Sequence, residues 1–115
     1  MSLVSLLQKQ VESRAEAICR HRNQSLPAEL GKADFESIPN GVIFLKLHYL
    51  LDSAHASYTA PVAKVYWCDE KQAWSLMMID GDDDEQWLAY PYLAQSQDLT
   101  AIMRELDRDP KNLFW

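Results

Sequence analysis

The chain has 115 residues, the usual size of one domain, and a chain of this length buries about two-thirds of its unfolded surface without a disulfide or a metal. Its hydrophobic content of 48% and charged content of 24% are those of a globular protein and exclude a disordered one. The net charge of −6 is concentrated in residues 33–115, which contain fourteen acidic residues and six Lys and Arg. An acidic body repels phosphate and so disfavours nucleic-acid binding.

The pattern at the start of the chain predicts a helix from Leu3 to about Arg22. Apolar residues recur at steps of three and four on one side, and charged residues fill the other. The inner positions are Leu3, Leu7, Val11, Ala15 and Ile18. Asn23 and Ser25 favour turns, and Pro27 pushes the residue before it out of the helical region, so the helix is expected to end there.

The pair Asn40-Gly41 predicts a β-hairpin of type I′, because both central positions of that turn need a positive φ. The hairpin would join a strand at Phe35–Ile38 to one at Val42–Leu50. In the second strand one face is fully apolar, and it is made by Ile43, Leu45, Leu47, Tyr49 and Leu51. The other face includes Lys46 and His48, so we expect it to be only partly covered.

Three more strands are predicted after a loop over residues 52–61. They lie at Val62–Cys68, Ala73–Ile79 and Gln86–Tyr90, and the short turns between them indicate an antiparallel meander. Pro91 closes the sheet.

A short second helix follows, with Asp98 as its expected N-cap and Ser96 as the alternative. Its inner stripe is Leu99, Ile102, Met103 and Leu106. Asp109-Pro110 stops this helix, and the final aromatic residues are expected to fold back onto the core. The predicted fold class is therefore α+β: an N-terminal helix, a five-stranded antiparallel meander sheet and a short C-terminal helix, forming one domain over residues 1–115.

Several motifs of the second half recur together in one family. A strand opens with Pro-Val, the next strand holds a Trp, the last strand holds Trp-x-x-Tyr, and Asp-Pro and Phe-Trp follow the closing helix; here they are Pro61-Val62, Trp74, Trp87 with Tyr90, Asp109-Pro110 and Phe114-Trp115. In these features residues 60–115 resemble a small bacterial family known as domain of unknown function 3024. The resemblance implies the predicted fold and a bacterial cytoplasmic setting, and it implies no activity.

The cellular location follows from segments that the sequence lacks. The start of the chain has neither the basic region nor the apolar run of a signal peptide. No apolar segment approaches the length of about 20 residues that crosses a bilayer. Cys19 and Cys68 lie far apart in no paired motif, as free thiols do. We expect a cytoplasmic protein that does not bind membranes.

The run Asp80–Glu85 puts five carboxylates into six residues and is a candidate metal site through Asp82 and Asp84. An EF-hand loop starting at Asp80 would need a glycine at its sixth position and a glutamate at its twelfth, where this chain has Glu85 and Pro91. The run departs from the resembled family as well. We therefore interpret it as the solvated tip of a hairpin, and we expect no metal and no cofactor.

Nucleophilic catalysis would need a thiol or hydroxyl beside a base. Cys68 ends one predicted strand and His48 lies in another that could pair with it, so a Cys68–His48 dyad is a candidate. The chain has only three glycines and lacks a nucleophile elbow or a phosphate-binding loop. A buried structural thiol is the competing interpretation.

Aromatic residues on three successive strands give the main functional signal. They are Tyr66, Trp67, Trp74, Trp87 and Tyr90. Alternation places Trp67 opposite to Tyr66 and Trp87 opposite to Tyr90, so the set divides between two faces. Most would pack in the core, and any set that the helices leave uncovered would form a platform for a partner.

These patterns favour a non-catalytic module that binds a protein through an aromatic sheet face, with Trp67, Trp74, Trp87 and Tyr90 as its candidate binding residues. Two alternatives stay open. One is a small hydrolase that uses the thiol dyad or a metal at the acidic run. The other is a homodimer formed through sheet edges or the tryptophan face.

Overall fold

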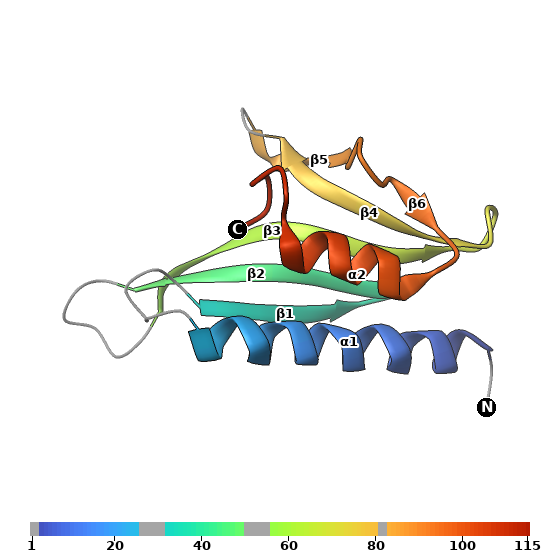
Figure 1. Cartoon of the computed structure of the whole chain (residues 1–115), viewed down its shortest axis with the longest axis horizontal. Helices are drawn as coiled ribbons and strands as arrows, with labels where there is room; N and C mark the ends of the chain where they lie inside the picture. The colour runs from blue at the N-terminus through green and yellow to red at the C-terminus, as the bar shows by residue number, and fades with distance from the viewer. Residues whose placement is uncertain (1–2, 26–31, 50–55, 81–82) are drawn as a thin grey trace.

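The computed structural model describes residues 3–25, 32–49, 56–80 and 83–115. The elements in chain order are α1 (Leu3–Ser25), β1 (Lys32–Ile38), β2 (Gly41–Tyr49), β3 (Ala56–Cys68), β4 (Ala73–Asp80), β5 (Asp83–Ala89), β6 (Gln95–Ser96) and α2 (Leu99–Arg108). The predicted fold class is confirmed: an N-terminal helix, an antiparallel sheet and a short C-terminal helix (Figure 1). Neither helix in these ranges is long and apolar enough to cross a membrane.

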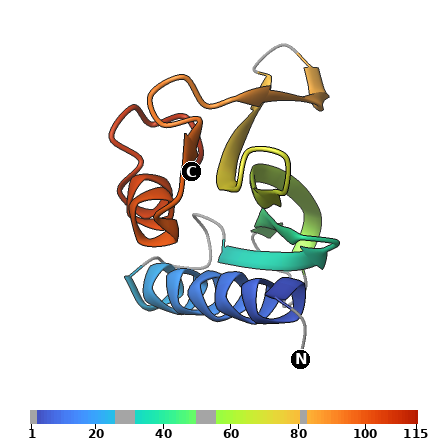
Figure 2. The ribbon, with the colours of Figure 1, turned by 90° about the vertical axis from the view of Figure 1, so that its right-hand side faces the viewer.

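The sheet is an antiparallel meander in the order β1-β2-β3-β4-β5. The short strand β6 was not predicted; it pairs with the first part of β4, where Trp74 lies opposite Ser96. Helix α1 runs along β1 and β2, while α2 packs on β4 and β6 (Figures 1 and 2). Both helices lie on the same side of the sheet, so the opposite side is left without a helix.

The hairpin between β1 and β2 forms where it was predicted, but its turn is different. Ile38 pairs with Gly41, so the two loop residues are Pro39 and Asn40. Asn40 has a φ of 66°, and proline followed by a positive φ is the pattern of a type II turn rather than type I′. Gly41 is the first residue of β2 and is required by packing, because a Cβ there would overlap the Val65 carbonyl oxygen.

Three strands begin at least three residues earlier than predicted. β1 starts at Lys32 instead of Phe35. β3 starts at Ala56 and contains Pro61, which lies at an irregularity in the pairing with β2, where a missing N–H donor is tolerated. β5 starts at Asp83 instead of Gln86. The hydrophobic pattern could not mark these starts because polar residues continue the backbone ladder as well as apolar ones.

The covered face of β2 is opposite to the one predicted. Val42 and Phe44 are fully buried, whereas Ile43 is only partly buried. The register places Ile43 between Glu36 of β1 and Lys64 of β3, so its face would bury charged neighbours if a helix covered it. The buried cluster comprises Val11, Ala15, Ile18, Cys19, Ala33, Val42, Phe44, Val62, Ala63, Val65, Trp74, Leu76, Tyr90, Leu99, Ile102, Met103, Leu106 and Phe114.

Helix α2 begins and packs as predicted. The Asp98 side chain accepts a hydrogen bond from the Thr100 amide at 3.0 Å, which satisfies one free donor of the first turn. All four residues of the predicted stripe are buried: Leu99, Ile102, Met103 and Leu106.

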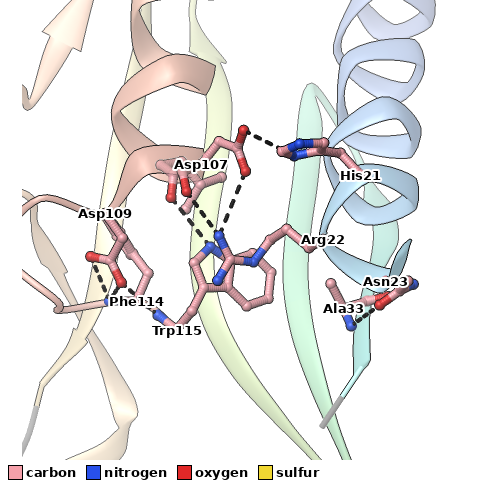
Figure 3. A network of polar contacts seen from close by, with 9 residues as sticks. His21, Arg22, Asn23, Ala33, Asp107, Asp109, Phe114 and Trp115 are labelled. Carbon is pink, nitrogen blue, oxygen red and sulfur yellow. Dashed lines mark hydrogen bonds and ion pairs between the residues drawn. The ribbon is translucent and has the colours of Figure 1, made fainter. Parts of the chain in front are cut away.

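The chain folds back after α2, and Asp109 fixes the reversal (Figure 3). Its carboxylate accepts hydrogen bonds from the main-chain amides of residues 113–115, the last at 2.9 Å. The Trp115 indole donates to the Leu106 carbonyl oxygen, its ring meets Phe44 edge-on, and the Arg22 guanidinium lies 4.4 Å from the ring centroid. The prediction that the final aromatic residues fold back is confirmed.

Helix α1 also protects the free edge of β1. The Asn23 side chain donates to the Ala33 carbonyl oxygen at 2.9 Å and accepts from the Ala33 amide at 2.7 Å. These are the backbone groups through which another strand would pair. Ser37 donates to Glu12 of α1 near the other end of the strand. Extension of the sheet at this edge therefore competes with α1.

Candidate interaction surface

The side of the sheet that faces away from both helices carries a continuous apolar surface, which we call the open face. Among the residues that the cross-strand register places on it, nine partly exposed ones form its centre. They are Ile43, Leu45, Leu47, Pro61, Lys64, Tyr66, Met77, Ile79 and Trp87. No helix or strand in the described ranges covers these side chains, so they are available to another molecule.

Lys64 lies at the centre of the open face between two aromatic rings. Its Nζ is 5.6 Å from the centroid of the Tyr66 ring and 5.2 Å from that of the Trp87 ring. Tyr66 lies two residues after Lys64 on β3 and therefore on the same face, and Trp87 of β5 is placed by its pairing with Ile79 of β4. Both distances are within the range of a cation–π interaction, so the rings and the lysine fix one another's positions.

The aromatic residues divide between the two faces as alternation predicted. Trp74 and Tyr90 are buried under the helices, and Trp67 packs edge-to-face on Trp74 with ring centroids 5.4 Å apart. Of the four candidate binding residues, the open face thus contains Trp87 alone. Tyr66 accompanies it there.

Tyr90 shows why one member of the set is structural. Its side chain is fully buried, and its hydroxyl donates a hydrogen bond of 2.8 Å to the carboxylate of Glu105 on α2. Burial, followed by the bond to Glu105, raises the pKa of Tyr90 above its usual value. The ring also stacks on Phe114, with centroids 4.9 Å apart, so Tyr90 ties β5 to α2 and to the C-terminal segment.

Acidic residues border the open face on its β1 side. Asp34 and Glu36 are exposed and lie opposite Leu45 and Ile43 in the register. Residues 33–115 carry a net charge of −8, counted from six Lys and Arg and fourteen Asp and Glu. The field around the open face is therefore negative, with Lys64 as a positive charge at its centre and Lys32 as another at its border, opposite Leu47.

A family profile described as Domain of unknown function (DUF3024) matches residues 3–115. The chain belongs to this family. Comparison with curated proteins and with solved structures returned no match. The match extends the resemblance from the second half to α1 and the first hairpin.

The DUF3024 motifs found in the sequence have mainly structural positions in this chain. Trp74, Tyr90 and Phe114 are core residues, and Asp109 holds the C-terminal segment. Trp87 differs from them because it lies on the open face. The structure gives no activity to any of these motifs.

The structure does not bring Cys68 and His48 together. β2 and β3 are antiparallel, and the register pairs His48 with Tyr58, ten residues before Cys68. At about 3.3 Å per residue the two positions are roughly 33 Å apart along the strand, far beyond the reach of a hydrogen bond. The side chain of His48 lies outside the described part of the structure, but the strand register that places the residue is defined by the backbone.

The described part of the acidic run lies in two paired strands. Asp80 ends β4 and pairs with Asp83, the first residue of β5. Asp82 lies outside the described residues, as does the side chain of Asp84. Within the described ranges, no group of three or more His, Cys, Asp or Glu residues could hold a metal ion.

Sequence reasoning missed the role of Lys64. The signal was present as Lys64-Val65-Tyr66, since residues two apart on a strand share a face. The neighbouring Trp87 could not be added from the sequence, because it is placed by the pairing of β3 with β4 and of β4 with β5.

Proposed function

We propose that this DUF3024 chain is a non-catalytic protein-binding module whose open face docks a partner with an apolar centre and basic surroundings. The observation that carries the proposal is the cluster of Tyr66, Lys64 and Trp87 in the middle of an uncovered apolar surface. Aromatic anchors surrounded by apolar contacts are the usual source of binding energy at protein interfaces.

The preference for a basic partner follows from the charges at the border. A partner with lysine or arginine beside its apolar residues would meet Asp34 and Glu36, and the acidic body would attract it from a distance. At the open face an acidic partner would be repelled except at Lys64. The open face thus supplies contact area and charge complementarity.

The test uses an isotope-labelled full chain and a synthetic peptide of alternating lysine and leucine. Titration followed by NMR should shift the Trp87 indole signal and the amides of Lys64 and Tyr66. Trp87→Ala should weaken binding about tenfold or more, the effect of removing an interface hot spot. Tyr92→Ala is the matched control, because Tyr92 is an exposed aromatic residue that is not on the open face.

Two results would contradict the proposal. The first is a peptide that binds with unchanged affinity to Trp87→Ala. The second is a set of shifts confined to the helices. Circular dichroism of both variants shows whether the fold is kept, and we expect it to be, because Trp87 is partly exposed and lies outside the buried cluster.

A further inference from the structure

A groove between α1 and α2 gathers positive charge in a chain whose net charge is −6. It consists of two adjoining hollows of about 390 and 510 Å³ that share Arg14 and Thr100. The first hollow is lined by three arginines, one from α1 and two from α2: Arg14, Arg104 and Arg108. The groove lies on the helical side of the sheet, so it is separate from the open face.

These three arginines differ from the other two in having no charged partner among the residues that the structure describes. The chain has five arginines, all on the two helices. Arg20 pairs with Glu16 at 2.9 Å, and Arg22 binds Asp107 and the Trp115 ring. The other three are exposed and have no hydrogen bond or ion pair with any residue that the structure describes. Their charge is therefore free for a ligand.

The groove is elongated, and its cations are spread along both rims. Arg104 and Arg108 lie four residues apart on one face of α2, about 6 Å along the helix axis. Arg14 faces them from α1. These separate positions suit a segment with repeated negative groups, because each group can meet its own arginine.

The acidic residue that lines the first hollow, Asp107, already has two partners within the chain. Asp107 lies 3.6 Å from the Arg22 guanidinium and 3.7 Å from Nδ1 of His21, which faces it from α1 (Figure 3). Asp107 therefore does little to cancel the three free arginines. The hollow also includes the apolar residues Ile18 and Met103, which can receive part of an apolar side chain.

We propose that this groove binds an acidic segment of a partner protein, with carboxylates on Arg14, Arg104 and Arg108 and an apolar side chain against Ile18 and Met103. A protein segment is favoured over a nucleic acid because the carboxylates of a segment can be confined to the groove, whereas a nucleic acid continues its phosphates beyond the groove along the negative body of the chain, which repels them. This site goes beyond the proposed function, since it uses another surface and a partner of opposite charge.

The test measures fluorescence anisotropy of a labelled synthetic peptide of alternating glutamate and leucine, with the full chain at low salt. We expect saturable binding that weakens as salt rises, because exposed charges are screened. Arg104→Gln and Arg108→Gln should each weaken binding about two- to fivefold, the range of exposed ion pairs. The triple variant that also contains Arg14→Gln should lose binding.

Arg20→Gln is the matched control, because it removes the same charge from a position on α1 that does not line the groove. Equal weakening by Arg20→Gln and Arg104→Gln would overturn the proposal, since only net charge would then matter. Tighter binding of a single-stranded oligonucleotide than of the peptide would overturn it too, and so would undetectable peptide binding at low salt. Trp87→Ala should leave this binding unchanged, which separates the outcome from that for the open face.

Discussion

Gly41→Ala tests the inference that packing, rather than turn geometry, requires glycine at this position. A Cβ there would overlap the Val65 carbonyl oxygen and lie 2.7 Å from the Tyr66 Cα. Both are backbone atoms in the central strand β3, so they cannot move away as the end of a flexible side chain does. Relief must come from separating β2 and β3, beside the 2.7 Å hydrogen bond from the Trp67 amide to the Asn40 carbonyl oxygen.

The size of the effect follows from these contacts. Overpacking a well-filled site costs about 1–3 kcal/mol, and each weakened backbone hydrogen bond adds about 1 kcal/mol. We expect Gly41→Ala to lower the free energy of unfolding by about 2–4 kcal/mol. The entropy of unfolding of a chain of 115 residues is about 240 cal/mol/K, so the thermal midpoint should fall by roughly 8–17 °C.

The assay is thermal and urea unfolding followed by circular dichroism, with Asn40→Gly and Asn40→Ala alongside. Asn40 has the positive φ, so glycine there should be neutral or stabilising, while alanine should cost about 1 kcal/mol. If the hairpin were type I′, both positions would need a positive φ, and alanine would cost about the same at each. A loss for Gly41→Ala that is no larger than that for Asn40→Ala would refute the packing argument.

Three further predictions concern the core and its thiols. The folded state raises the pKa of Tyr90 through burial and the bond to Glu105, so the free energy of unfolding should hold below the unfolded pKa of about 10 and fall as pH rises above it. Tyr90→Phe should lower the free energy of unfolding by about 1–2 kcal/mol near neutral pH. The same variant should flatten the alkaline fall when urea unfolding is measured across pH. Asp109→Gly keeps the left-handed backbone at φ 45° but removes the acceptor of the last three main-chain amides. The free energy of unfolding should fall by about 2 kcal/mol, and hydrogen exchange at residues 113–115 should become faster. Unchanged exchange would contradict the inference that Asp109 holds the C-terminal segment. Burial raises the pKa of Cys19 to about 12, so mass spectrometry after brief iodoacetamide treatment should find Cys68 modified before Cys19, and the reverse order would show that Cys19 is accessible.

Local chemistry in the sequence was enough to predict both helices and every strand of this fold except the two-residue β6. The spacing of apolar residues in α1 and α2 gave their buried sides, and Asp98 and Asp109-Pro110 gave the bounds of α2 to within a residue. These signals are local because a helix satisfies its backbone within itself, and its periodicity is visible in one short window.

Strand limits and the choice of faces needed the neighbouring strands. Both faces of β2 are rich in apolar residues, so its own sequence could not show that Val42 and Phe44 are the buried positions. The register decided it by placing Ile43 between Glu36 and Lys64. Cross-strand contacts join residues far apart in the chain, and no window of the sequence contains both partners.

The candidate surfaces divide in the same way. Alternation along single strands separated Tyr66 from Trp67 and Trp87 from Tyr90, and the structure confirms both divisions. Only the tertiary structure decided that the two helices cover one side, leaving Lys64 between two rings on the other. It alone brought the arginines of α1 and α2 to one groove, because the packing of two helices more than 70 residues apart in sequence is set by the core that they share and not by either helix itself.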